Sequence, residues 1–209
     1  IPSVIFYLSG NVSWIYFSQS VIKISNTFST NAYIFGKVYF PRLVAPISII
    51  ISNLIGFAIQ FLLFISFYLF YVITGKVNPD ISISSLILIP FLILNLSILG
   101  LGTGLLISSL TTKYKDFKQF IGFGVQLLMY MSPVIVPMSI ILKRFPKWTV
   151  PFLEYNPMTP IIEGFRVAFF NQYNYDLNQL IYSISIAIAI FIFGTILFNK
   201  TEQNFIDTV

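Results

Sequence analysis

The sequence of 209 residues contains neither cysteine nor histidine. Without cysteine the chain cannot form a disulfide bond, a thiolate metal site or a cysteine nucleophile. Without histidine it has no histidine-based catalytic triad, metal ligand or haem ligand. The phosphate-binding patterns GxxxxGKS and GxxxxGKT are also missing, which excludes ATP binding and hydrolysis by this chain in the P-loop manner. The remaining residue types offer no catalytic set and no metal site.

Charged residues are scarce as well. They make up 9% of the chain, whereas 56% is hydrophobic, and a typical soluble domain has about 25% charged residues. A helix needs about 20 mainly apolar residues to cross the hydrocarbon core of a membrane, and five charge-free stretches reach this length. We therefore predict an all-α fold, a polytopic transmembrane helical bundle forming one domain over 1–209, with spans over about 1–22, 43–75, 81–112, 119–142 and 177–199.

The basic residues are distributed unevenly between the connections. Seven of the 12 lysines and arginines lie in 23–42, 113–118 and 200–209, and the other five lie in 76–80 and 143–176. Because cytoplasmic connections carry an excess of lysine and arginine, we predict that the first set faces the cytoplasm. The net charge of +5 therefore reflects membrane topology and does not indicate a nucleic-acid partner.

The first of these connections, residues 23–42, is too long for a turn and too apolar for a flexible linker. We predict one or two short helices at the membrane surface, closed by Pro41. A surface helix joined rigidly to a span can carry a partner's movement into the membrane, so the end of this loop is a candidate coupling element. The alternative is that its basic residues only anchor the topology, with Tyr39 and Phe40 as interfacial aromatics.

Residues 143–176 combine four prolines and seven charged residues with many apolar ones. We predict a broken, partly re-entrant hairpin, because irregular backbone is tolerated at membrane depth only where it is buried in protein or lines water. Thr159 and Pro160 followed by Glu163 indicate the start of a helix. Glu163 and Arg166 are spaced to pair; the pair either serves an outer gate or a lipid headgroup contact, or only neutralises two charges at the interface.

Small residues and prolines interrupt two of the predicted spans. Gly100, Gly102 and Gly104 in the third span predict a face that packs closely against another helix, although simple helix flexibility is the alternative. Pro133 and Pro137 in the fourth span are expected to kink or break the helix. Aromatic residues, at 18% of the chain, are more than interfacial belts need; they either line a conduit for sugars or simply face lipid.

The carboxylates all lie outside the charge-free stretches; they are Asp80, Asp116, Glu154, Glu163, Asp176, Glu202 and Asp207. Ion-coupled transporters usually bury an ionisable group at mid-membrane, so this pattern argues against proton or sodium coupling. A transporter built from this chain would need a separate ATPase subunit.

Four motifs follow one another along the chain: KVYFPR over 37–42, YKDF over 114–117, MSPVIVP over 131–137 and YNPMTPIIEGFR over 155–166. In this combination the sequence resembles the membrane subunit of type-2 ABC exporters for polysaccharides, the family that exports O-antigen, capsule and teichoic acid chains. The resemblance covers essentially the whole chain. Each motif alone is weak, but the four in order are specific.

The resemblance implies a half-transporter of six spans in the bacterial plasma membrane, of which five fall within this chain. Because the sequence starts at Ile1 without a methionine, we expect a further span upstream. The resemblance also implies a homodimer, a polyprenyl-diphosphate-linked polysaccharide as cargo, and a separate ATPase subunit that binds ATP and magnesium. It implies no cofactor or metal in this chain.

Individual residues receive roles from the same resemblance. The coupling loop against the ATPase would end in Lys37, Val38, Tyr39, Phe40, Pro41 and Arg42. The second cytoplasmic loop would contain Tyr114, Lys115 and Asp116. The outer gate between the last two spans would include Pro133, Pro137, Asn156, Pro157, Pro160, Glu163 and Arg166.

Other functions stay open from the sequence. The nearest is a type-2 ABC permease for drugs or lipids. A different class is an integral membrane enzyme acting on polyprenyl-linked glycans, for which the outer cluster Glu154, Glu163, Arg166 and Asp176 is the only support. A channel is disfavoured because no charged ring or filter motif lines a span.

Overall fold

Helices form all the regular structure in the described part of the chain. The computed structural model describes residues 2–28, 30–31, 41–77, 83–114, 116–138, 140–141, 146, 148–170 and 176–206. The elements considered below are α1 (Ser3–Ser25), α3 (Val44–Ile73), α4 (Ile83–Lys113), α5 (Phe117–Tyr130), α7 (Val150–Glu154), α8 (Met158–Phe170) and α9 (Leu177–Ile206). The predicted all-α class is therefore confirmed.

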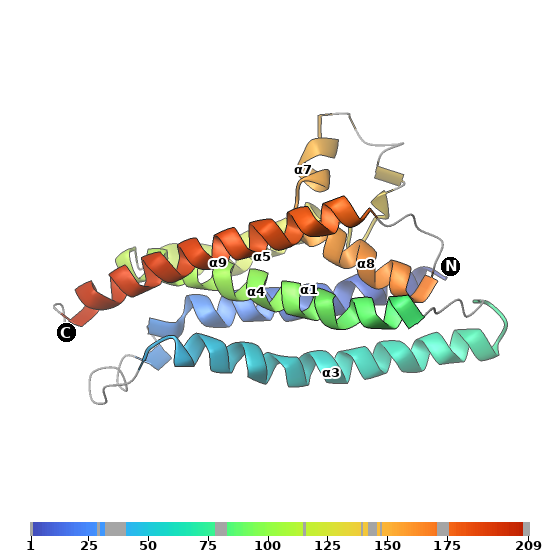
Figure 1. The fold of residues 1–209 in the computed structure, drawn as a ribbon, viewed down its shortest axis with the longest axis horizontal. Helices are drawn as coiled ribbons and strands as arrows, with labels where there is room; N and C mark the ends of the chain where they lie inside the picture. Colours follow the sequence, from blue (N-terminus) through green and yellow to red (C-terminus); the bar gives the residue numbers. More distant parts are fainter. Residues whose placement is uncertain are drawn as a thin grey trace.

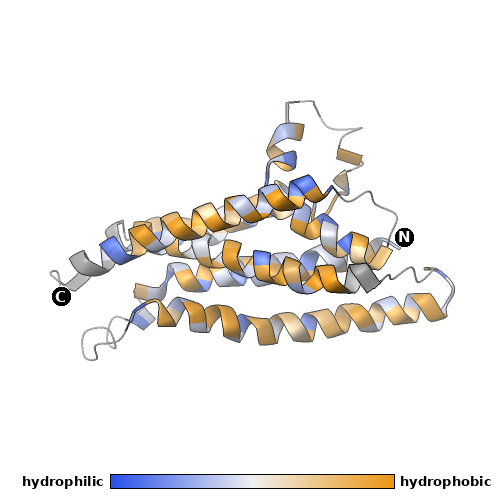
Figure 2. Ribbon diagram, in the orientation of Figure 1, coloured by the Kyte–Doolittle hydropathy of each residue, from blue (hydrophilic) through white to orange (hydrophobic). Residues whose placement is uncertain are grey.

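Among the described residues, three helices are long and apolar enough to cross a membrane. They comprise Val44–Ile73 of α3, Ile87–Thr112 of α4 and Leu177–Thr201 of α9, and they fall on the second, third and fifth predicted spans. All three run along the long axis of the molecule, and apolar residues cover most of their length (Figures 1 and 2). The architecture is a polytopic helical bundle.

Helix α1 is the inner helix of this bundle. It contacts α3, α4, α5 and α8, and 12 of its 23 residues are buried. Four of the buried residues are serines, and α1 is not among the helices apolar enough to qualify as a span. The first predicted span is thus a helix with four serines that are buried against neighbouring helices.

The fourth predicted span, 119–142, is broken in the structure. Helix α5 has 14 residues and is therefore about 21 Å long, short of the roughly 30 Å hydrocarbon core. The helix ends at Tyr130, just before Pro133, because a proline inside a helix removes a hydrogen bond and clashes with the preceding turn. Helix α8 lies beyond the end of α5 along the bundle (Figure 1), and both contact α1.

Glycines allow α4 to approach its neighbours closely. A Cβ atom added at Gly102 would lie 2.7 Å from the backbone N and Cα of Phe191 in α9, and one at Gly104 would lie 2.7 Å from Cβ of Ile24 in α1. From the other side, a Cβ at Gly194 would lie 2.6 Å from the carbonyl oxygen of Gly102. The predicted packing face is confirmed, because each of these contacts requires a residue without a side chain.

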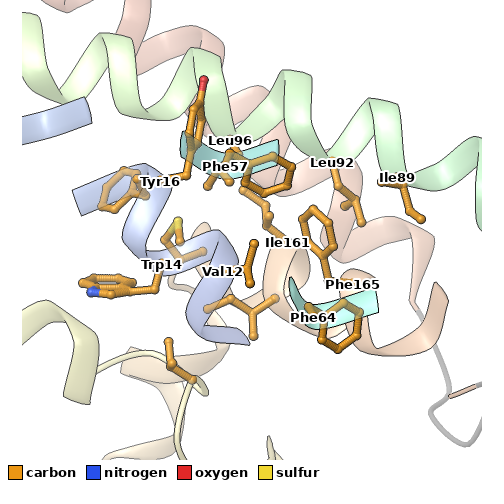
Figure 3. Packing of buried hydrophobic residues seen from close by; sticks show 14 of the residues in the cluster. Val12, Trp14, Tyr16, Phe57, Phe64, Ile89, Leu92, Leu96, Ile161 and Phe165 are labelled. Atoms are coloured by element: carbon orange, nitrogen blue, oxygen red, sulfur yellow. The ribbon is translucent and has the colours of Figure 1, made fainter. Parts of the chain in front are cut away.

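Aromatic rings form much of the core where α3 meets α8. Figure 3 shows Phe64 and Phe165 with their rings among aliphatic side chains of α1, α4 and α8. Phe64 lies edge-on to Phe169, with 4.9 Å between ring centroids, and the hydroxyl of Tyr68 donates to the carbonyl oxygen of Phe169 at 3.1 Å. Because these rings are buried, they hold α8 on α3 and do not line an open conduit within this chain.

Candidate functional site

The candidate site lies where α8 enters the bundle next to the break after α5. Eleven of the 13 residues of α8 are buried. The helix begins at Met158, so that Pro160 is its third residue, where the missing N–H of proline costs no helical hydrogen bond. The sequence therefore places the helix start within two residues of its position in the structure.

Arg166 is the most deeply buried charged side chain described in this region, with none of its surface exposed. One terminal nitrogen donates to Oε1 of Glu163 at 2.9 Å, and the other donates to the carbonyl oxygen of Val134 at 2.8 Å. The guanidinium also stacks over the ring of Phe6, 3.7 Å from its centroid. These contacts offset the cost of removing a charge from water.

Gly10 supplies the space for this arginine. A Cβ atom added at Gly10 would lie 3.0 Å from a terminal nitrogen of Arg166, 3.2 Å from the carbonyl oxygen of Val134 and 3.3 Å from Ile162. Gly10 of α1 therefore packs directly against the hydrogen bond between the guanidinium and the Val134 carbonyl. We name Phe6, Gly10, Val134, Glu163 and Arg166 the arginine hub.

Asn156 connects the same two segments a second time. Its side-chain amide donates to the carbonyl oxygen of Met131 at 2.9 Å and lies 3.0 Å from the hydroxyl of Ser132. Its Oδ1 accepts a hydrogen bond from the backbone N–H of Met158 at 2.9 Å. The side chain of Asn156 therefore accepts a hydrogen bond from a backbone N–H at the start of α8 and also holds the turn that follows α5.

The remaining residues predicted for the outer gate lie around this region. Pro133 is buried in the turn after α5, and Pro137 is half-buried further along. The carbonyl oxygen of Pro157 accepts a hydrogen bond from Ser183 of α9 at 2.7 Å, and Ser183 in turn accepts from Asn95 of α4 at 2.9 Å. The structure thus brings the motifs over 131–137 and 155–166 into contact, although neither their spacing nor their order indicates which atoms meet.

The predicted cytoplasmic residues belong to the other end of the bundle, where α3 begins and α4 ends (Figure 1). Arg42 is buried there and Tyr114 is exposed, Pro41 is exposed just before α3, and Asp116 is exposed just before α5. The predicted residues Lys37, Val38, Tyr39, Phe40 and Lys115 lie outside the described residues.

The acidic residues considered for an enzyme do not converge on one point. Glu163 pairs with Arg166, whereas Asp176 caps α9 by accepting the backbone N–H of Asn178 at 2.9 Å. Glu154 belongs to α7, which projects from the bundle (Figure 1). Among the described residues there is no cluster of three acidic residues that could hold a metal ion.

Sequence analysis missed three members of the hub; the third, Val134, lies within the motif over 131–137 but received no role of its own. Phe6 and Gly10 lie about 160 positions before Arg166 in the sequence, and no local pattern connects them. The available signal was the glycine itself, since a glycine inside a helix weakens it unless close packing requires the space.

Comparison with known proteins shows which family the chain matches. Residues 5–170 match the family described as ABC-2 type transporter. Two O-antigen export system permease proteins RfbA of Klebsiella pneumoniae are each 27% identical to the chain over 202 residues, covering 96% of the chain and 73% of the relative. A protein of the same name from Myxococcus xanthus is 20% identical over 210 aligned positions, covering 100% of the chain and 77% of the relative. The chain belongs to the ABC-2 type transporter family, as a membrane subunit of a transporter and not an enzyme.

Proposed function

We propose that this chain is the permease of an ATP-driven exporter that moves polyprenyl-diphosphate-linked polysaccharide from the cytoplasm across the bacterial plasma membrane. The observation that carries the proposal is similarity over 96% or more of the chain to permeases named for O-antigen export. The four ordered motifs, which extend from residue 37 to residue 166, are consistent with it.

The energy for transport comes from a partner in this proposal. The chain has no P-loop and so no ATP site of that kind. Glu163 on the buried helix α8 is paired with Arg166, unlike the ionisable group that an ion-coupled transporter keeps for its ion. ATP and magnesium are bound by a separate ATPase subunit. The permease acts as a homodimer, and the loop ending in Lys37–Arg42 contacts the ATPase, with the loop around Tyr114–Asp116 beside it.

The arginine hub serves the outer gate in the same proposal. It joins α1, the turn after α5 and α8 through one side chain. A movement of α1 relative to α8 must therefore break the contact between Phe6 and Arg166, and a movement of the turn after α5 must break the hydrogen bond from Arg166 to the carbonyl oxygen of Val134. Such a cluster suits a gate with two discrete arrangements better than a surface that deforms gradually.

Deletion of the gene in its host, followed by localisation of the lipid-linked surface glycan, tests the proposal. Accumulation of glycan on the cytoplasmic face with a depleted cell surface is the expected result. Failure to form the glycan at all would assign the protein to synthesis instead. A normal surface glycan would contradict polysaccharide export and favour a permease for drugs or lipids.

The ATPase partner requires a second measurement. Alanine substitution of Phe40 and Arg42 in the full-length protein is expected to abolish export while the permease remains in the membrane. ATP hydrolysis by the purified complex should then proceed without transport. Unchanged export by this variant would remove the coupling role from the loop.

A further inference from the structure

A polar groove lies at one end of the bundle, away from the arginine hub. It has a volume of about 400 Å³ and lies between the last turn of α1 and the first turns of α3. Lys23, Asn26, Thr30, Asn31 and Ser48 provide its polar lining, and the apolar lining consists of Ile22, Ala45 and Ile49.

A buried asparagine holds the lysine of this groove in place. The ammonium of Lys23 donates to Oδ1 of Asn53 at 2.7 Å, and the amide of Asn53 donates to the hydroxyl of Ser20 at 3.1 Å. Asn53 is buried and uses both ends of its amide in these contacts. Lys23 therefore presents a fixed ammonium with two further N–H donors to the groove.

No carboxylate among the described residues neutralises the charge of Lys23. In the part of the structure that is described, Lys23 makes no ion pair. The sequence contains no aspartate or glutamate before Asp80, so neither α1 nor α3 contributes a carboxylate. A single negative charge in the groove would meet one ammonium and the neutral amides and hydroxyls of Asn26, Thr30 and Asn31.

An exposed apolar stripe leads away from the groove along α3. Ser48 in the groove is followed at helical spacing by Ile51, Ile55, Ile59 and Leu62, each 60–66% exposed. Residues three or four apart lie on the same face of a helix. The groove and the stripe together match an amphiphile with a small anionic headgroup and a long apolar chain.

We propose that this groove binds the phosphodiester headgroup of an anionic phospholipid, with an acyl chain lying along the α3 stripe. A phosphodiester carries one negative charge, which matches the single ammonium of Lys23. The groove lies at the end of a membrane-spanning helix, at the level where headgroups are found. A polyprenyl diphosphate would bring more negative charge than the described lining of the groove, with Lys23 as its one charged residue, can balance.

Binding is tested with the full-length permease in detergent, titrated with phosphatidylglycerol or phosphatidylcholine and observed by native mass spectrometry. We expect phosphatidylglycerol to bind preferentially, and Lys23→Gln to raise its dissociation constant about tenfold, the effect of losing one charged hydrogen bond. Lys200→Gln is the matched control, because Lys200 is exposed at the same end of the bundle but outside the groove. This control should bind phosphatidylglycerol as the parent does.

A second variant separates loss of binding from loss of folding. Ser48→Leu fills the groove from α3 without touching the contact between Lys23 and Asn53, and should weaken phosphatidylglycerol binding similarly. Retention of phosphatidylglycerol by both variants would overturn the proposal.

Two competitors identify the source of the phosphate. Displacement by soluble glycerol 3-phosphate at equal concentration would show a free-phosphate site, and preferential binding of polyprenyl diphosphate would show a cargo site. Either result would overturn the phospholipid assignment, whereas failure of both to compete supports it.

Discussion

At the scale of single residues, the arginine hub contains a buried charge that would destabilise the molecule if it lost its partners. A guanidinium without exposed surface is tolerated only while its hydrogen bonds are kept, because an unpaired buried charge costs about 3–5 kcal/mol. Glu163, the Val134 carbonyl and the Phe6 ring share that task. A substitution that removes any of these contacts should therefore lower the free energy of unfolding by more than the number of atoms removed suggests.

Gly10→Ala tests the packing at Gly10 in the hub. The added methyl would lie 3.0 Å from Arg166 and 3.2 Å from the Val134 carbonyl oxygen, and neither group can retreat because they bond to each other. Overpacking typically costs about 1–3 kcal/mol, more than the roughly 1 kcal/mol gained in helix propensity. Thermal unfolding of the purified protein should show a lower Tm.

Gly56→Ala in α3 is the control for Gly10→Ala. A Cβ atom at Gly56 would meet nothing within 4 Å, so this alanine should leave the Tm unchanged or raise it slightly. Equal behaviour of the two variants would show that the hub tolerates the extra atom.

Arg166→Lys distinguishes a functional hub from a merely structural one. Lysine keeps the charge but cannot reproduce the planar fork that reaches Glu163 and Val134 together. We expect surface glycan in a complemented deletion strain to fall by a larger factor than the amount of permease in the membrane. A loss of permease proportional to the loss of glycan would instead show that Arg166 only stabilises the fold.

At the scale of elements, the contact between α4 and α9 depends on two glycines that face each other. A methyl at Gly102 or at Gly194 would overlap the opposite backbone, at 2.7 Å and 2.6 Å. Backbone cannot rotate away as a side chain can, so each alanine must move one helix from the other. The two positions therefore act as one unit.

Gly102→Ala and Gly194→Ala should each lower the free energy of unfolding by about 1–3 kcal/mol. The double variant should lose clearly less than the sum of the single losses, because the first methyl already separates the helices and makes room for the second. Chemical unfolding of all four proteins in detergent measures this coupling. Strict additivity would mean that each glycine has its own independent partner.

The elements also show what the sequence can predict. Length and charge place α3, α4 and α9, because lipid-facing helices must be apolar over their whole length. By the same criterion the fourth predicted span continues beyond Tyr130, where α5 ends. Pro133 and Pro137 are uncharged and therefore do not interrupt a charge-free stretch. Prolines at these positions do indicate a break, but not that Asn156 fixes the chain on its far side.

The partners within the site could not be predicted from the sequence. The pair of Glu163 and Arg166 is local and follows from helical spacing. The contacts of Arg166 with Phe6 and Val134 are set by how α8 packs on α1, which depends on the aromatic core around Phe64 and Phe169. Such contacts require the complete arrangement of helices.

At the scale of the whole molecule, orientation in the membrane decides whether the proposed function is possible. In the proposed exporter the ATPase lies in the cytoplasm, so the proposed coupling loop before α3 would have to face that side. The C-terminal end of α9 lies at the same end of the bundle as the start of α3 (Figure 1). Phe28, which follows α1, stacks against Phe198 of α9 with 4.6 Å between ring centroids, and both pack in one apolar cluster with Ile50 of α3.

Single cysteines introduced into this naturally cysteine-free chain test the orientation with a membrane-impermeant maleimide. Lys76→Cys and Trp148→Cys should react in intact cells, whereas Tyr114→Cys and Lys200→Cys should react only after lysis; all four side chains are exposed. The parent protein without an introduced cysteine controls for background labelling. The reverse pattern would leave the helical bundle intact but place the coupling loop beyond reach of any cytoplasmic ATPase, and ATP-driven export by this chain would then be untenable.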